Sequence, residues 1–266
     1  MGLNLRSSRE IQKMRAPGLL VWQAHQLTGE MIRPGVTTAQ LNRAIAELFE
    51  KHQAIPLFLN YPGTVPFPAV ACISVNEEVV HGIPGPRELK EGDIVSIDTG
   101  CSLGGWCGDA AVTHPVGKIS QDAQLLLDVT RGVLELAIDL MSRKRKWSEV
   151  AREMQDYVVD NGLAVVEEFV GHAIGREMHE KPQVPNYYDA ERFQGAGDFE
   201  LKTGLVLAVE PMVNQGTKQV RCLDDHWTIV TRDHSLSAHF EHTLALTSDG
   251  VRILTGPPLE GESTDF

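Results

Sequence analysis

Five acidic and imidazole side chains lie inside or at the ends of apolar, β-branched segments. These side chains are Asp98, Asp109, His172, Glu210 and Glu241. Burying an unpaired carboxylate is costly, so each of them needs a partner. Four carboxylates and one imidazole form an oxygen-rich ligand set that suits Mn(II), Fe(II) or Co(II) and can also hold Zn(II). With carboxylates shared between ions, the set predicts two divalent metals that activate a water molecule as a nucleophile.

Ordinary salt bridges are the alternative interpretation of these acids, because the chain also contains 24 Lys and Arg residues. For any one acid, a salt bridge is the simpler explanation. Because the five groups are all embedded in β-branched runs, a shared metal site explains them better together.

The segment 171–182 combines two imidazoles, His172 and His179, with Glu180 and two glycines. It follows the apolar run 165–170, which predicts a buried strand. A histidine can ligate a metal or transfer a proton, because its pKa lies near neutrality. One histidine on an apolar strand is more often a packed core residue, so the chemical interpretation depends on the other acids.

The acids Asp98 and Asp109 fall on two predicted strands, 94–98 and 106–113, separated by a glycine-rich reversal. A hairpin of this kind brings the two carboxylates opposite one another on one face. Two facing carboxylates repel unless a proton or a cation lies between them. The hairpin is therefore expected to position two of the metal ligands.

Apolar spacing and turn residues predict the other elements. Pro17-Gly18 should kink or break a helix over 8–31, and the aromatic loop 55–68 lines either a pocket or a satellite hydrophobic cluster. The remaining predictions are helices from Thr37 or Thr38 to Phe49, over 120–144 and over 148–162, strands over 71–75, 79–81, 205–209, 227–230 and 238–247, a polar loop over 186–197 and a frayed tail over 261–266. Helices followed by strands, twice over, indicate two similar halves that meet near residues 115–120.

The composition excludes several classes of function. A net charge of −12 argues against nucleic-acid binding, and the basic run 143–146 fits a solvated helix end. Four cysteines without a C-x-x-C pair predict free thiols in a reducing compartment. No signal peptide and no membrane-length apolar run is evident, so a cytoplasmic protein without a membrane partner is expected.

Five motifs, in order along nearly the whole chain, are similar to the signatures of methionine aminopeptidases. They are Asn76–Pro84 with His81, the pair Asp98 and Asp109, Gly171–Pro182, Glu210-Pro211-Met212, and Ser237–Thr243. The chain resembles the compact bacterial form of type I, without the zinc-binding N-terminal extension of eukaryotic members. The resemblance implies an α/β (α+β) pita-bread fold with a curved antiparallel sheet covered by helices. It also implies one catalytic domain over 1–266, with pseudo-twofold halves of about 1–118 and 119–254 and a tail over 255–266.

The resemblance also implies roles for individual residues. Asp98, Asp109, His172, Glu210 and Glu241 would hold two divalent ions (Co, Mn, Fe or Zn), with Asp109 and Glu241 bridging. Glu210 would serve as general base, and His81 and His179 would contact the scissile amide and the tetrahedral intermediate. Tyr61, Phe67, Cys72 and Trp227, together with Phe58 and Met178, would line the pocket for the methionine side chain.

The substrate implied by the resemblance is a peptide or nascent protein that begins with Met and has a small second residue. We expect a monomer that works near the ribosome and binds no specific nucleic acid. Two features depart from the bacterial pattern: the segment Pro62–Pro66 is longer, and Val80, Ala173 and Met178 replace the usual residues. These departures concern the pocket rim and leave every predicted metal ligand in place.

Two alternatives stay open. Xaa-Pro dipeptidases and aminopeptidases share the fold, but they carry a second N-terminal domain and Glu-Pro-Gly in place of Glu210-Pro211-Met212. A non-catalytic binding protein could also keep the fold, although such relatives usually lose metal ligands. Cleavage of Met-Gly-Met but not of Gly-Pro peptides would exclude the first alternative. The second alternative predicts protein that holds no stoichiometric metal after reconstitution.

Overall fold

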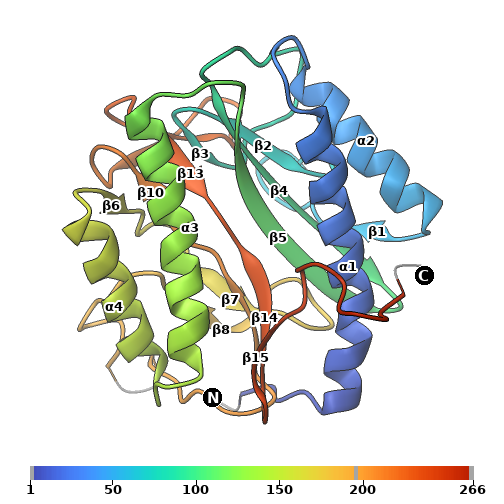
Figure 1. The fold of residues 1–266 in the computed structure, drawn as a ribbon, viewed down its shortest axis with the longest axis vertical. Coiled ribbons are helices and arrows are strands. Elements are labelled where there is room, and N and C mark those ends of the chain that lie inside the picture. The colour runs from blue at the N-terminus through green and yellow to red at the C-terminus, as the bar shows by residue number, and fades with distance from the viewer. Residues whose placement is uncertain (1–2, 195–196, 264–266) are drawn as a thin grey trace.

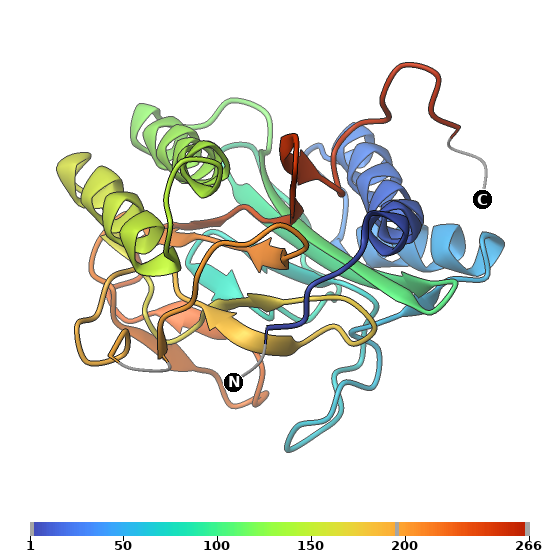
Figure 2. The same ribbon diagram turned by 90° about the horizontal axis from the view of Figure 1, so that it is seen from below.

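Two pairs of helices cover the strands in the computed structural model, which describes residues 3–194 and 197–263. α1 (Ser8–Met31) lies beside α2 (Thr38–Lys51), and α3 (Gln121–Met141) lies beside α4 (Trp147–Asp160). Figure 1 shows one pair on each side of β5 (Trp106–Pro115). Seen from below in Figure 2, the two helix pairs lie at the left and right ends of the strand layer, with most of the strands between and below them. Two helices followed by strands thus occur twice along the chain.

The strands pair in antiparallel fashion throughout the described residues, and they form four sheets. The predicted α/β (α+β) class with antiparallel sheets is confirmed. The other strands are β1 (Ile55–Pro56), β2 (Cys72–Val75), β3 (Glu78–Val80), β4 (Ile94–Leu103), β6 (Ala164–Val165), β7 (Gly171–Ala173), β8 (Glu180–Val184), β9 (Val206–Val209), β10 (Met212–Asn214), β11 (Val220–Cys222), β12 (Ile229–Thr231), β13 (Ser237–His239), β14 (His242–Thr247) and β15 (Gly250–Ile253). Their orders are β1-β4-β2 with β5 on β4, β13-β10-β6, β11-β12-β3, and β15-β14-β9-β7-β8.

The helices α1, α2 and α3 begin at side-chain caps that the sequence makes recognisable. Ser7 and Thr37 each accept a hydrogen bond from the backbone N–H three residues later, and Glu10 and Gln40 complete capping boxes. Ser120 caps α3 in the same way. These interactions satisfy N–H groups that the first helical turn would otherwise leave unpaired.

The predicted break of the first helix at Pro17-Gly18 is wrong, because α1 continues through both residues. A side chain on Gly18 would lie 2.2 Å from the Leu254 carbonyl oxygen, and one on Gly108 would lie 2.8 Å from the Gly18 nitrogen. The helix therefore touches β5 and the C-terminal segment closely at this point. Tertiary packing compensates for the hydrogen bond that Pro17 cannot make.

Three predicted strands differ in the structure. The run 165–170 is not one strand, since β6 ends at Val165 and β7 begins at Gly171. The segment 238–247 is divided into β13 and β14. The strand predicted over 79–81 spans Glu78–Val80 as β3 and pairs with β12. The changes of direction place polar side chains at strand ends, which periodicity within one segment cannot predict.

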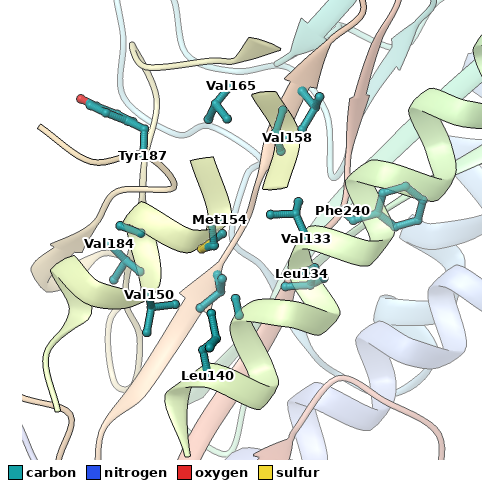
Figure 3. Close-up of a cluster of buried hydrophobic side chains, with 14 of the residues drawn as sticks. Val133, Leu134, Leu140, Val150, Met154, Val158, Val165, Val184, Tyr187 and Phe240 are labelled. Atoms are coloured by element: carbon teal, nitrogen blue, oxygen red, sulfur yellow. The ribbon is translucent and has the colours of Figure 1, made fainter. Parts of the chain in front are cut away.

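The two helix pairs cover separate hydrophobic clusters. One cluster joins α1 and α2 to β2, β4 and β5, and the larger one joins α3 and α4 to β9 and β14. Figure 3 shows Val133, Leu134, Val150 and Met154 of the larger cluster pointing between α3 and α4. β5 and β14 connect the two regions, because the Thr243 hydroxyl both donates to the Asp109 carbonyl and accepts from the Asp109 N–H.

The predicted fraying of the tail is wrong at Glu262, which binds the buried guanidinium of Arg15 with N–O distances of 2.9–3.2 Å. Arg15 also donates to the carbonyls of Leu254, Gly256 and Pro257. Residues 264–266 of the predicted tail lie outside the described residues.

Within the described chain, no helix has both the length and the apolar character that crossing a membrane requires.

Candidate active site

The hairpin of β4 and β5 presents Asp98 and Asp109 on the same face. Asp98 is paired with Ala111 and Asp109 with Gly100, so the two acids are diagonal neighbours rather than directly opposite residues. A methyl group on Gly100 would lie 2.8 Å from the Asp109 carboxylate, which explains the glycine at this position. The predicted hairpin is confirmed with this change of register.

Glu210 and Glu241 occupy two strand breaks that lie side by side. β9 stops before Glu210-Pro211, and β13 stops before Phe240-Glu241. The Phe240 N–H donates to the Pro211 carbonyl at 3.4 Å, so the breaks face each other. The Glu241 N–H donates to the Ala111 carbonyl at 2.9 Å, which ties this glutamate to the hairpin. Pro211 has no N–H for a ladder, and this favours the break.

His172 reaches the same place from β7, where it is paired with Ala208 of β9. Its Nδ1–H donates to the Ala173 carbonyl at 3.1 Å, so Nε2 is the nitrogen that remains available as a ligand. That Nε2 lies 3.4 Å from a carboxylate oxygen of Glu210. Ligand atoms of Asp109, His172 and Glu241 all lie within 4.8 Å of one another.

Burial disfavours the charged forms of these five groups. It raises the pKa of Asp109 to about 7, and burial together with the neighbouring carboxylates raises the pKa values of Asp98, Glu210 and Glu241. Burial also lowers the pKa of His172 to about 4. One buried oxygen each of Asp98, Asp109 and Glu241 has no hydrogen-bond partner among the residues that the structure describes.

These unpartnered oxygens fit a cation better than they fit a network of hydrogen bonds. Among the described residues that line the cavity around them, none is a lysine or an arginine. A divalent ion would balance the carboxylate charges and use the free lone pairs. Asp98, Asp109, His172, Glu210 and Glu241 are therefore suited to hold divalent metal, and we call these five residues the floor of the site.

The floor opens into a cavity of about 300 Å³. One side of the cavity, which we call the aromatic wall, consists of Phe58, Phe67, Cys72, Met178 and Trp227. The Phe67 and Trp227 rings meet edge to face with centroids 5.2 Å apart. All six residues predicted to surround the methionine side chain, the five of this wall and Tyr61, line the cavity.

The His179 ring packs edge to face against the His172 ring, with centroids 4.3 Å apart. Its Nδ1 lies 2.8 Å from the Tyr61 hydroxyl oxygen. When this hydroxyl donates to Nδ1, the Nε2 atom carries the proton and can donate to a ligand. Burial lowers the pKa of His179, which keeps the ring neutral near pH 7.

His81 follows β3 with a φ of 60°, a backbone conformation that is unusual for a residue with a side chain. Its ring meets Phe169 and Trp227 at near-right angles, with centroid distances of 5.3 Å and 6.2 Å. Burial lowers the pKa of His81 to about 4. Gly82 permits the close approach of β2 behind it, because a side chain there would lie 2.5 Å from the Ile73 carbonyl oxygen.

Residues 58–67 form the rim of the cavity without a regular strand. The Asn60 N–H donates to the Phe67 carbonyl at 2.8 Å, and the Phe67 N–H donates to the Tyr61 carbonyl at 3.0 Å. The Trp227 indole N–H donates to the Val65 carbonyl at 2.8 Å. The long segment Pro62–Pro66 thus rests on the aromatic wall.

Sequence reasoning missed a second apolar side of the cavity. It contains Val80, Phe169 and Met212, which belong to a separate hydrophobic cluster, and we call these three residues the second wall. Val170 and His239 also line the cavity. The spacing of His239 from Glu241 was an available signal, because residues two apart in an extended segment point to the same side.

Comparisons with known proteins agree with this geometry. The model of metallopeptidase family M24 matches residues 12–248. A methionine aminopeptidase of Clostridium perfringens is 45% identical over 251 residues, which cover 94% of this chain and 98% of that protein. Methionine aminopeptidase 1 of Bacillus subtilis is 43% identical over 250 residues, with coverage of 94% and 98%.

Solved structures show the same relationship. The crystal structure of a methionine aminopeptidase from Thermotoga maritima has a TM-score of 0.90 and 40% identity, covering 96% of this chain and 100% of that one. An Xaa-Pro dipeptidase from Bacillus anthracis shares the fold at a TM-score of 0.71 but has only 18% identity, covering 96% of this chain and 62% of that one. The chain therefore belongs to metallopeptidase family M24 and, within that family, to the methionine aminopeptidases.

Proposed function

We propose that this protein removes the N-terminal methionine from peptides and nascent proteins whose second residue is small. The observation that carries the proposal is the floor, where ligand atoms of Asp109, His172 and Glu241 converge and three buried carboxylate oxygens lack hydrogen bonds among the described residues. The aromatic wall beside this floor offers an apolar, polarisable surface that suits an unbranched thioether.

Two divalent ions (Co, Mn, Fe or Zn) would be held by the floor, where Asp109 and Glu241 would supply carboxylate ligands. Divalent metal lowers the pKa of water so that hydroxide is available near neutral pH. His172 would ligate through Nε2, since Nδ1–H is already bound to the Ala173 carbonyl. Asp98 and Glu210 would complete the set.

Individual residues of this chain would then have separate roles in hydrolysis. Glu210 would take the proton of the attacking water and deliver it to the leaving amine. His179, with Nδ1 bound to Tyr61, would direct its Nε2–H at the oxygen of the tetrahedral intermediate. His81 would bind the scissile amide from the opposite side of the methionine pocket.

Peptide cleavage by metal-free protein supplied with Mn(II), Fe(II), Co(II) or Zn(II) tests the function. We expect metal-dependent release of Met from Met-Ala-Ser, slower release from Met-Val-Ser, and none from a Gly-Pro peptide. Glu210→Gln should abolish release, whereas Glu177→Gln, which changes an exposed carboxylate outside the floor, should not. If the folded protein released no Met with any of these metals, or if it cleaved the Gly-Pro peptide, the proposal would be contradicted.

We further propose one monomeric catalytic domain that acts in the cytoplasm, near the ribosome where nascent N-termini emerge. The four unpaired thiols Cys72, Cys101, Cys107 and Cys222 support a reducing compartment. Light scattering of the purified protein tests whether it is a monomer in solution, because a dimer would have twice the molar mass of one chain.

A further inference from the structure

The carboxylate of Glu180 closes the loop that carries the preceding residue, His179, into the cavity. It accepts hydrogen bonds from the backbone N–H of Arg176 at 2.9 Å and from that of Glu177 at 3.4 Å. Residues 174–179, between β7 and β8, form neither a helix nor a strand, so they lack the support of a ladder. The Glu180 carboxylate therefore restrains the backbone that leads to His179.

This carboxylate is held from outside the loop by the segment that precedes α1. The Nη2 atom of Arg6 donates to both of its oxygens, and the side-chain amide of Asn4 donates to one of them at 3.1 Å. The side chains of Arg6 and Glu180 are only 14% and 9% exposed. Charge-assisted hydrogen bonds that are shielded from water in this way hold a geometry better than an ion pair on the open surface.

The surroundings of Arg6 leave its guanidinium one defined position. The Arg6 N–H donates to the Gly204 carbonyl at 2.7 Å, which fixes the backbone before α1. A side chain on Gly175 would lie 2.2 Å from the Arg6 guanidinium and 2.8 Å from the Glu180 carboxylate, so glycine leaves room for the ion pair. The ring centroid of Trp106, a buried residue of β5, lies 5.4 Å from the Arg6 Cζ. The guanidinium is thus enclosed between the loop before β8 and the hairpin of β4 and β5.

The proposed role of His179 requires such a support. A donor to the oxygen of the tetrahedral intermediate is effective only when it is held within about 0.5 Å of the productive position. Tyr61 and His172 restrain the His179 ring, through a hydrogen bond and an edge-to-face contact. Glu180 restrains its backbone, so both ends of the His179 side chain are fixed.

We propose that Arg6 is a positioning residue, which holds the Glu180 carboxylate so that the loop before β8 presents His179 to the floor. The inference rests on the proposed function and adds to it a residue that is 174 positions away from Glu180 in the sequence. Arg6 is not among the described residues that line the cavity, so its effect on catalysis passes through Glu180 and His179.

Substitution of Arg6 tests this role. Arg6→Met keeps the apolar stem of the side chain and the backbone bond to Gly204, but it removes the donors to Glu180. We expect kcat for Met-Ala-Ser to fall by about tenfold, with KM and Co(II) affinity changed by less than about twofold, because a displaced His179 affects the intermediate more than the bound substrate. Arg6→Lys should keep kcat within about threefold of the wild-type value, since one nitrogen of Arg6 makes both bonds.

Glu262→Gln is the matched control, because it weakens an ion pair of another arginine near the N-terminus, Arg15, at the C-terminal segment. It should lower the melting temperature without lowering kcat. Circular dichroism verifies that each variant is folded.

Two further measurements separate positioning from a general loss of stability. In the presence of His179→Ala, Arg6→Met should cause no additional loss of kcat, because both changes act through the same donor. Nitrogen NMR of labelled histidine in the Zn(II)-loaded protein should show a displaced or broadened His179 signal in Arg6→Met, with the His25 signals unchanged.

The outcomes distinguish this inference from the proposed function. If the wild-type protein releases no Met from any peptide, the proposed function is contradicted, and the His179 signal of Arg6→Met still decides whether Arg6 positions the loop. If Arg6→Met keeps the wild-type kcat and His179 signal, or loses kcat equally with and without His179→Ala, the role of Arg6 is contradicted. If Arg6→Met does not fold, Glu180→Gln decides, because a folded Glu180→Gln enzyme with the wild-type kcat would overturn the inference.

Discussion

The floor and the rim of the cavity are built in contrasting ways. Each floor residue lies on a strand or directly next to one in the sequence, and strand pairing fixes its position. The rim, residues 58–67, depends on a few hydrogen bonds within the loop and one from Trp227. Main-chain ladders resist small displacements better than isolated loop contacts do.

This contrast assigns chemistry and specificity to different parts of the molecule. Metal ligands must be held within fractions of an ångström, which suits strands. A rim made of a loop tolerates changes of length and sequence, which suits a surface that adapts to different substrates. We therefore expect changes in the floor to affect metal binding and turnover, and changes in the rim to affect substrate binding.

The largest effect is expected from Asp109→Asn, which removes one carboxylate charge from the floor. Activity on Met-Ala-Ser should fall by about a thousandfold, because metal-assisted stabilisation amounts to several kcal/mol. Kinetics and the metal content after dialysis measure the loss. Asp249→Asn on the exposed turn before β15 is the control, and an Asp109→Asn enzyme that keeps its metal and its turnover would contradict the assigned role.

Acid should lower the free energy of unfolding of the protein through His25 of α1, which is hydrogen-bonded to the hairpin that carries Asp109. Its Nε2–H donates to the Ala110 carbonyl at 2.9 Å, and burial lowers its pKa from 6.5 to about 3. The unfolded chain takes up this proton as pH falls below 6.5, whereas the folded protein does not. The contribution of His25 to stability is therefore complete above pH 6.5 and is lost progressively down to about pH 3.

The loss for His25 should be on the order of a few kcal/mol. Urea unfolding of metal-free protein between pH 7.5 and pH 4.5 measures part of it, in parallel with His25→Gln. The glutamine amide can donate to Ala110 but cannot titrate, so the variant should lose less stability on acidification. Parallel losses in the two proteins would show that His25 does not titrate in this way.

One added methyl group compares floor and rim directly. In Gly100→Ala it would lie 2.8 Å from the Asp109 carboxylate, and in Gly63→Ala it would lie 2.5 Å from the Trp227 ring. Gly100→Ala should weaken metal binding by about tenfold or more, with activity partly restored by excess metal. Gly63→Ala should raise KM for Met peptides by only about threefold, without a change in metal affinity.

Titration calorimetry with Co(II) and steady-state kinetics separate these two effects. Gly85→Ala is the matched control, because no atom of the described residues beyond Gly85 and its two chain neighbours lies within 4 Å of the added methyl group, and the backbone needs no positive φ there. Loss of metal affinity in Gly63→Ala would mean that the rim and the floor are coupled.

The smallest effect is expected from Tyr61→Phe, which removes the hydroxyl bound to His179. We expect kcat to fall by about threefold to tenfold with little change in KM, as a single net hydrogen bond allows. Nitrogen NMR of labelled histidine should show that His179 no longer favours the Nε2–H tautomer. Tyr157→Phe on α4 is the control, and an unchanged tautomer in Tyr61→Phe would assign Tyr61 to pocket lining alone.

Local patterns in the sequence were sufficient for the regular elements. The caps Thr37 and Ser120 begin their helices as expected, and the glycine-rich reversal joins β4 to β5. These signals succeed because caps and turns involve residues only a few positions apart. The motifs around Asp98, His172, Glu210 and Glu241 likewise identified the family, since each keeps its chemistry within a short segment.

Long-range packing decided the features that these patterns missed. α1 passes through Pro17 because Gly18 lies against Leu254, which is distant in sequence. Glu210 and Glu241 come together because two strand breaks face each other, and Tyr61 reaches His179 across the cavity.

The sequence by itself therefore determined the family and most helices, and it supplied the residues that we propose as ligands, since these depend on residue type and short spacing. Only the tertiary structure determined the break in each strand, the second wall of the cavity and the pairing of Arg6 with Glu180. The physical reason is that burial and pairing depend on which distant segments meet, and one segment alone does not specify its partner.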